Sequence, residues 1–140
     1  MGNRAVITTS TDHYKGTGIY LHWNGGIESI LAFCAAAKER GYRDPESDPH
    51  YAMARLTGLI HEFFGVHQNT SVGIGSMENL DCDNYDNGVY VIGRNWQIID
   101  RYGKGSTPLN HESNYQVKQS AKCQEIIDSL RLESATLESK

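Results

Sequence analysis

The feature that most constrains this fold is that its β-rich segments come in pairs. Residues 4–9 and 19–23 are rich in β-branched and aromatic side chains, and a polar stretch with Gly16 and Gly18 separates them. Residues 89–92 and 96–99 form a second pair, joined by only three residues. Short glycine-containing connections between such runs are typical of β-hairpins. We therefore predict two antiparallel hairpins, with an irregular further strand over residues 70–75.

Three segments between and after these pairs carry helical patterns. Apolar residues at three- and four-residue spacing predict a helix over about 26–40, a second over about 48–65 and a third over about 117–130. Asp48 and Pro49 are a favoured pair for a helix start, and Gly65 for its end. Because strands run in pairs and do not alternate singly with helices, the order favours an α+β domain. Its antiparallel sheet is built from β-hairpins, with about three helices packed on it.

Size and charge limit the classes of protein to consider. The chain has 140 residues and a formal net charge of −4, so we expect one domain over 1–132 and a flexible tail over 133–140. The acidic balance disfavours general nucleic-acid binding. No apolar run is long enough for a membrane span, and no signal peptide is recognisable. The cysteines Cys34, Cys82 and Cys123 form no CxxC pair, which is typical of reduced cytoplasmic thiols.

The strongest candidate binding motif lies between the second strand and the first helix. His22, Trp23, Asn24, Gly25 and Gly26 are consecutive there. The free backbone N–H groups at a helix start favour phosphate or carboxylate, and two glycines let a ligand approach the backbone. His22 could donate to the anion and Trp23 could stack on a base. The alternative is a tight strand-to-helix turn with a core tryptophan and a satisfied histidine.

Two other segments offer groups suited to a nucleotide. Thr8, Thr9 and His13 follow the first strand and could hold ribose or phosphate oxygens; the alternative is a solvated loop. Arg94 and Trp96 lie at the second hairpin turn, where a guanidinium beside an indole could hold an adenine or a phosphate. For Trp96 the alternative is a place in the core. We therefore expect a small nucleotide-like ligand.

The familiar catalytic and metal motifs are incomplete. The acidic loop that begins at Asp81 lacks the glycine and the final glutamate of a calcium loop. His61 and Glu62 lack the second histidine of a zinc protease, because Gly65 stands in its place. No spacing pairs a nucleophile or a carboxylate with a histidine for catalysis. The sequence therefore predicts no metal, cofactor or catalytic residue and leans against an enzyme without excluding one.

One resemblance extends over about the first 40 residues and the second hairpin. The segments 4–9, 18–26 and 28–33 resemble those of small accessory proteins encoded by phages, prophages and plasmids. This resemblance implies expression in the cytoplasm of a bacterial host cell. It further implies a role against host defence, either by blocking a CRISPR or restriction complex or by sequestering a nucleotide second messenger.

Together these observations lead to one hypothesis and two alternatives. The hypothesis is a phage-type counter-defence protein that sequesters a nucleotide-derived immune signal, such as a cyclic nucleotide or an ADP-ribose derivative. The first alternative is a protein–protein inhibitor whose partner is a host defence complex. The second is a phosphodiesterase that cleaves such a signal. A homo-oligomer is also compatible with the sequence, since the C-terminal helix could pair with a copy of itself.

Overall fold

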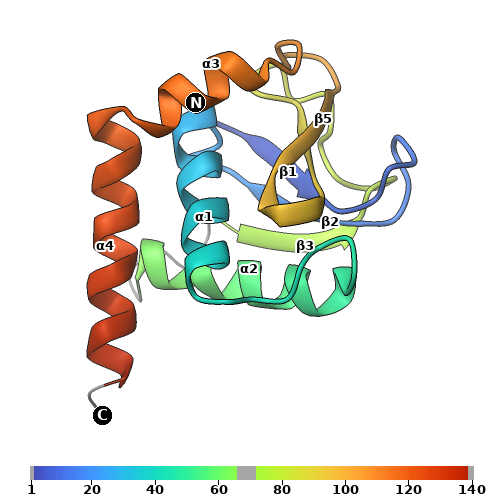
Figure 1. The fold of residues 1–140 in the computed structure, drawn as a ribbon. Helices are drawn as coiled ribbons and strands as arrows, with labels where there is room; N and C mark the ends of the chain where they lie inside the picture. Colours follow the sequence, from blue (N-terminus) through green and yellow to red (C-terminus); the bar gives the residue numbers. More distant parts are fainter. Residues whose placement is uncertain (1, 66–71, 139–140) are drawn as a thin grey trace.

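A five-stranded sheet organises the chain in a computed structural model, which describes residues 2–65 and 72–138 (Figure 1). The strand order is β3-β2-β1-β4-β5. The strands are β1 (Ala5–Thr8), β2 (Thr17–Leu21), β3 (Val72–Ser76), β4 (Val89–Ile92) and β5 (Ile98–Tyr102). The two predicted hairpins, β1–β2 and β4–β5, are confirmed. The predicted start of the third strand, Thr70 and Ser71, lies outside the described residues.

The sheet is mixed, although most of it is antiparallel. β1 pairs in the antiparallel sense with β2, as do β2 with β3 and β4 with β5. β1 and β4 pair in parallel, with Val6 opposite Val89. The antiparallel sheet predicted from the sequence is therefore confirmed for three of the four strand pairs. The exception is the β1–β4 pair, in which the first strands of the two hairpins lie side by side and run in the same direction.

Four α-helices accompany the sheet within the described residues, one more than expected. They are α1 (Ile27–Glu39), α2 (Pro49–Phe64), α3 (His111–Lys118) and α4 (Ala121–Glu138). The predicted caps of α2 are present, because the Asp48 carboxylate accepts from the Tyr51 N–H and Gly65 ends the helix at φ 75°. Most of α3 precedes the third predicted helix, which was expected to begin at about residue 117. The helix α3 buries no residue and so leaves no apolar periodicity to detect.

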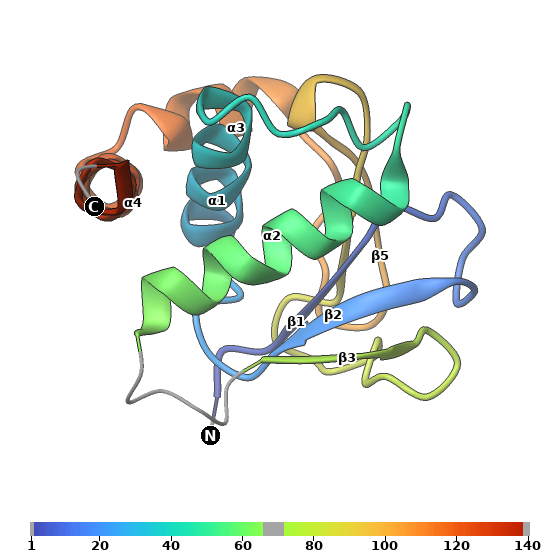
Figure 2. The same ribbon diagram turned by 90° about the horizontal axis from the view of Figure 1, so that it is seen from below.

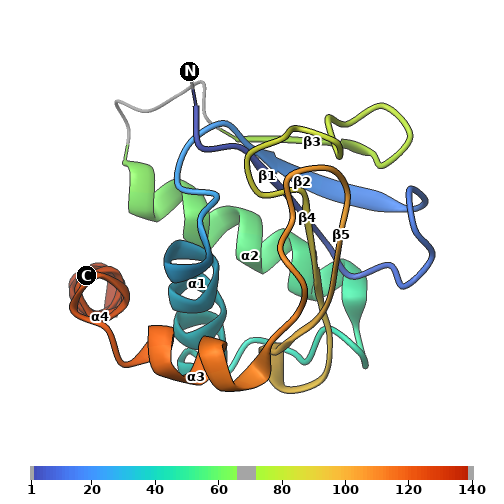
Figure 3. The ribbon, with the colours of Figure 1, turned by 90° about the horizontal axis from the view of Figure 1, so that it is seen from above.

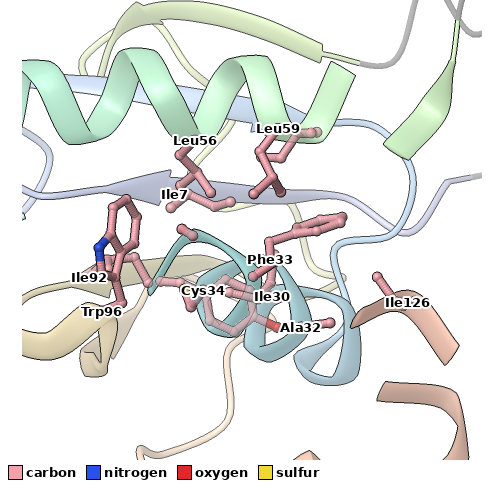
Figure 4. Close-up of a cluster of buried hydrophobic side chains, with 14 of the residues drawn as sticks. Ile7, Ile30, Ala32, Phe33, Cys34, Leu56, Leu59, Ile92, Trp96 and Ile126 are labelled. Atoms are coloured by element: carbon pink, nitrogen blue, oxygen red, sulfur yellow. The ribbon is translucent and has the colours of Figure 1, made fainter. Parts of the chain in front are cut away.

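The main core lies between the sheet and α1 and α2. Alternation along β1 turns Ile7 toward the helices and Val6 toward the other face. Figure 4 shows Ile7 facing Leu56 and Leu59 of α2 and Phe33 of α1. A smaller cluster on the opposite face contains Val6, Met77, Cys82, Val89, Val91 and Tyr102. The α+β class predicted from the sequence is confirmed.

The third layer is α4, which lies on the side of α1 away from the sheet (Figures 2 and 3). Lys122 pairs with Glu28, and Arg131 pairs with Glu39, so α1 and α4 run in the same direction. The segment 133–140, expected to be a tail, begins within the last turns of α4. No helix in the described part of the chain is both long and apolar enough to cross a membrane.

Candidate functional site

The connection between β2 and α1, where the sequence places its strongest motif, is packed against the N-terminal segment. The Gly25 N–H donates to the Asn3 carbonyl at 2.8 Å, and the Gly25 carbonyl accepts from the Tyr90 hydroxyl at 2.8 Å. A Cβ atom at Gly25 would lie 2.5 Å from the Asn3 oxygen. The backbone of Gly25 is thus used in contacts within the chain.

The first turn of α1 already has a carboxylate beside it. A Cβ atom at Gly26 would meet the Glu28 carboxylate at 2.9 Å, and Lys122 Nζ donates to Glu28 Oε1 at 2.9 Å. The Glu28 carboxylate accepts this hydrogen bond from Lys122 and a second one from the backbone N–H of Glu28 itself. Together the two hold the pKa of Glu28 below its ordinary value. The anion that a helix start favours is therefore supplied by the chain itself.

His22, Trp23 and Asn24 lie on the surface beside this turn. His22 Nδ1 is 3.0 Å from the Tyr20 hydroxyl. The Trp23 side chain is 44% exposed and meets the His22 ring edge-on, at a centroid distance of 5.0 Å. Asn24 has a left-handed φ of 59°, and its amide donates to the Ser29 hydroxyl. Trp23 is thus an exposed indole, and not the core tryptophan of the alternative interpretation.

The residues predicted around the β1–β2 loop point in different directions. The Thr8 hydroxyl is buried and donates to the Thr17 carbonyl at 2.8 Å. Thr9 borders a hollow beside the start of α2. His13 lies over the other side of the sheet, where it stacks on Tyr102 at 3.8 Å and bonds Asp100 at 2.8 Å. These three residues share no single cavity.

The two residues at the second hairpin turn are also separated in their roles. Arg94 forms an exposed ion pair with Glu46, at 2.8 Å. Trp96 is only 5% exposed, and its Nε1 donates to the Tyr42 carbonyl at 3.2 Å. Trp96 is therefore a core side chain, as Figure 4 shows from its place beside Ile92. The ten predicted residues do not form one site.

A hollow that the sequence did not reveal lies between α1, α3 and the β4–β5 turn. We call it the α1–α3 hollow, and its volume is about 210 Å³. An edge of Trp96 reaches it, which makes Trp96 the only predicted site residue on its wall. Its lining residues are Leu31, Cys34, Ala35, Lys38, Asn95, Trp96, Gln97, Ile98, His111, Asn114, Tyr115 and Lys118.

The charged side chains that line the α1–α3 hollow are of one sign, positive. Lys38 and Lys118 form no ion pair with any residue that the structure describes, and the lining contains no carboxylate. His111 adds an imidazole at the first position of α3. Two unneutralised ammonium groups beside an apolar wall favour an anion that carries an apolar or aromatic part.

The floor of the hollow contains a thiol that is not poised for chemistry. Burial raises the pKa of Cys34 to about 12, although the nearby Lys118 charge works in the opposite direction. The thiolate is the reactive form of cysteine, so Cys34 stays protonated near neutral pH. Among the described residues, no three His, Cys, Asp or Glu side chains gather closely enough to hold a metal ion.

Comparisons with known proteins found no match for this chain. Neither a protein-family model, nor a curated protein, nor a solved structure matches the chain.

Proposed function

We propose that this protein binds and sequesters a small nucleotide-like anion in the α1–α3 hollow. The observation that supports this most strongly is the pair Lys38 and Lys118, which stand without carboxylate partners among the described residues beside the wall formed by Trp96. Phosphate oxygens accept readily from ammonium groups. The base would lie against the apolar wall of Leu31, Ala35 and Trp96.

The lining favours binding over turnover. Cys34 is protonated at neutral pH, and no carboxylate in the lining could partner His111 in general acid–base catalysis. We therefore infer sequestration. The resemblance of residues 4–33 to small phage, prophage and plasmid proteins suggests a setting, in which the chain withdraws a nucleotide immune signal from the host cell.

Binding can be measured through the fluorescence of Trp96. Trp23 and Trp96 are the only tryptophans, so the Trp23→Phe variant leaves one reporter at the hollow. We expect saturable quenching by members of a panel of AMP, cyclic nucleotides and ADP-ribose. A flat titration to millimolar concentration across the whole panel would refute the proposal.

Charge variants test the position of the site. Lys38→Gln and Lys118→Gln should each weaken binding about tenfold, since each removes a charge-assisted hydrogen bond of about 1.5 kcal/mol. Lys15→Gln, which removes the same charge in the β1–β2 loop, should leave binding unchanged. Equal losses in all three variants would mean that only net charge matters. Product analysis after incubation separates sequestration from hydrolysis, because release of more than one equivalent of product would mean catalysis.

A second candidate, inhibition of a host defence complex by contact, rests on Trp23. An indole that is 44% exposed beside His22 is the kind of side chain that dominates protein interfaces. Purification of a stoichiometric host protein with the native chain, and its loss with Trp23→Ala, would support this function. Equal recovery with Trp23→Ala would exclude Trp23 as the anchor.

A further inference from the structure

A second hollow, between α1 and α4, borders the α1–α3 hollow. We call this the α1–α4 hollow; its volume is about 450 Å³. Ala35, Lys38 and Lys118 line both hollows, so the two lysines, which form no ion pair with any described residue, lie at the border between them.

The α1–α3 hollow is too small to enclose a drug-sized ligand by itself. Pockets for drug-sized ligands usually measure about 300–1,000 Å³, whereas the α1–α3 hollow measures about 210 Å³. A nucleotide with its base against Trp96 and its phosphate at Lys38 and Lys118 would already reach the border of this small hollow. Any further part of the ligand would therefore lie in the α1–α4 hollow.

The charges of the α1–α4 hollow decide what that further part can be. Arg131 is neutralised there by Glu39, at 2.8 Å, and by Asp128, at 3.1 Å. The Glu39 carboxylate itself lines the hollow and opposes a second anion. The Gln124 amide donates to the Lys118 carbonyl, and Ile127 adds an apolar surface. This hollow suits an uncharged group that can form hydrogen bonds.

We propose that the ligand has an internal phosphate or diphosphate between two uncharged arms. Lys38 and Lys118 bind the internal anion, one arm lies against Trp96, and the other lies between α1 and α4 beside Gln124. This inference rests on the proposed function and extends it, because it separates ligands with an internal phosphate from those with a terminal one.

Calorimetry with two adenine probes tests this arrangement. AMP has a terminal phosphate and one arm, while the dinucleoside monophosphate ApA has an internal phosphate and two arms but less negative charge. We expect ApA to bind at least tenfold more tightly than AMP. If AMP binds and ApA binds no more tightly, the further inference fails and the proposed function stands. If neither probe binds, and ADP-ribose does not bind either, the proposed function fails as well.

A blocking variant locates the second arm. Gln124→Phe narrows the α1–α4 hollow and removes the amide beside the proposed second arm, so it should reduce the affinity for ApA to that for AMP and leave the affinity for AMP unchanged. The matched control is Gln116→Phe, which makes the same change on the exposed side of α3. Thermal unfolding verifies that both variants are folded. Unaltered binding of ApA by Gln124→Phe, or an equal loss with Gln116→Phe, would overturn the assignment of the second arm.

Discussion

Gly25→Ala should destabilise the protein strongly, because the structure assigns Gly25 to packing and not to ligand contact. The added methyl would lie 2.5 Å from the Asn3 carbonyl oxygen and 2.7 Å from the Ala5 Cβ. Both neighbours are held in place, Asn3 by backbone hydrogen bonds to His22 and Gly25, and Ala5 by complete burial. The clash can therefore be relieved only by moving the β2–α1 connection.

The magnitude follows from the contacts that such a movement would weaken. Overpacking costs about 1–3 kcal/mol. The hydrogen bonds from Gly25 N–H to Asn3 and from Tyr90 to the Gly25 carbonyl contribute about 0.5–1.5 kcal/mol each. With partial relaxation, we expect a loss of about 3 kcal/mol in the free energy of unfolding. For a chain of this size that corresponds to a fall in Tm of about 10 °C.

Gly26→Ala is the matched control one residue further along. Gly26 has φ −69° and ψ 159°, which alanine adopts without strain, and its Cβ would meet only the flexible end of Glu28. We expect a loss of about 0.5–1 kcal/mol, typical of alanine at a helix N-cap. Urea unfolding followed by circular dichroism measures both variants. A Gly25→Ala protein within 0.5 kcal/mol of the native chain would refute the packing role.

Three other predictions concern the core and the loops. Asn84→Ala should cost about 3 kcal/mol in urea unfolding, because this buried side chain accepts from three backbone N–H groups and donates to two carbonyls in the loop before β4; a loss below 1 kcal/mol would contradict this role. Cys34 and Cys123 are buried, and burial raises the pKa of both thiols, so Ellman's reagent should label neither in the native protein but both in urea; fast native labelling would disprove their burial. Glu28→Gln should destabilise the protein at pH 7, because the folded protein lowers the pKa of Glu28. The stabilisation by the Glu28 carboxylate is complete at pH values above 4.5, the ordinary pKa, and disappears as the pH falls through the lower pKa of the folded protein. An equal loss of stability at pH 7 and pH 3 would contradict this sign.

Local sequence patterns predicted most of the fold. They missed features that depend on contacts between residues far apart in the chain. The β-branched side chains of residues 19–23 predicted a strand, which the structure places two residues earlier, at Thr17–Leu21. The helical spacing over 26–40 predicted a helix, which the structure confirms. The parallel pairing of Val6 with Val89 joins distant segments, and neither periodicity nor turn chemistry encodes such a contact. The helix α3 was not predicted because it buries no residue and has no apolar stripe.

The candidate site was predictable only in part for the same reason. Trp96 could be selected from its place beside a hairpin turn. Lys38 and Lys118 are ordinary lysines near helix ends, and their meeting depends on how α3 lies against α1. The helix start at Gly25 and Gly26 had the right local chemistry for an anion. Glu28, two residues later in the same turn, provides that anion from within the chain.

The central claim is the location of the ligand, and the two indole N–H signals in a ¹H–¹⁵N spectrum test it most directly. Trp96 borders the α1–α3 hollow, whereas Trp23 lies beside the glycine pair. During titration with AMP and then ApA, we predict that the Trp96 indole signal and the backbone signals of Lys38 and Lys118 shift, while the Trp23 signal stays in place. Shifts confined to Trp23, Gly25 and Gly26 would contradict the account.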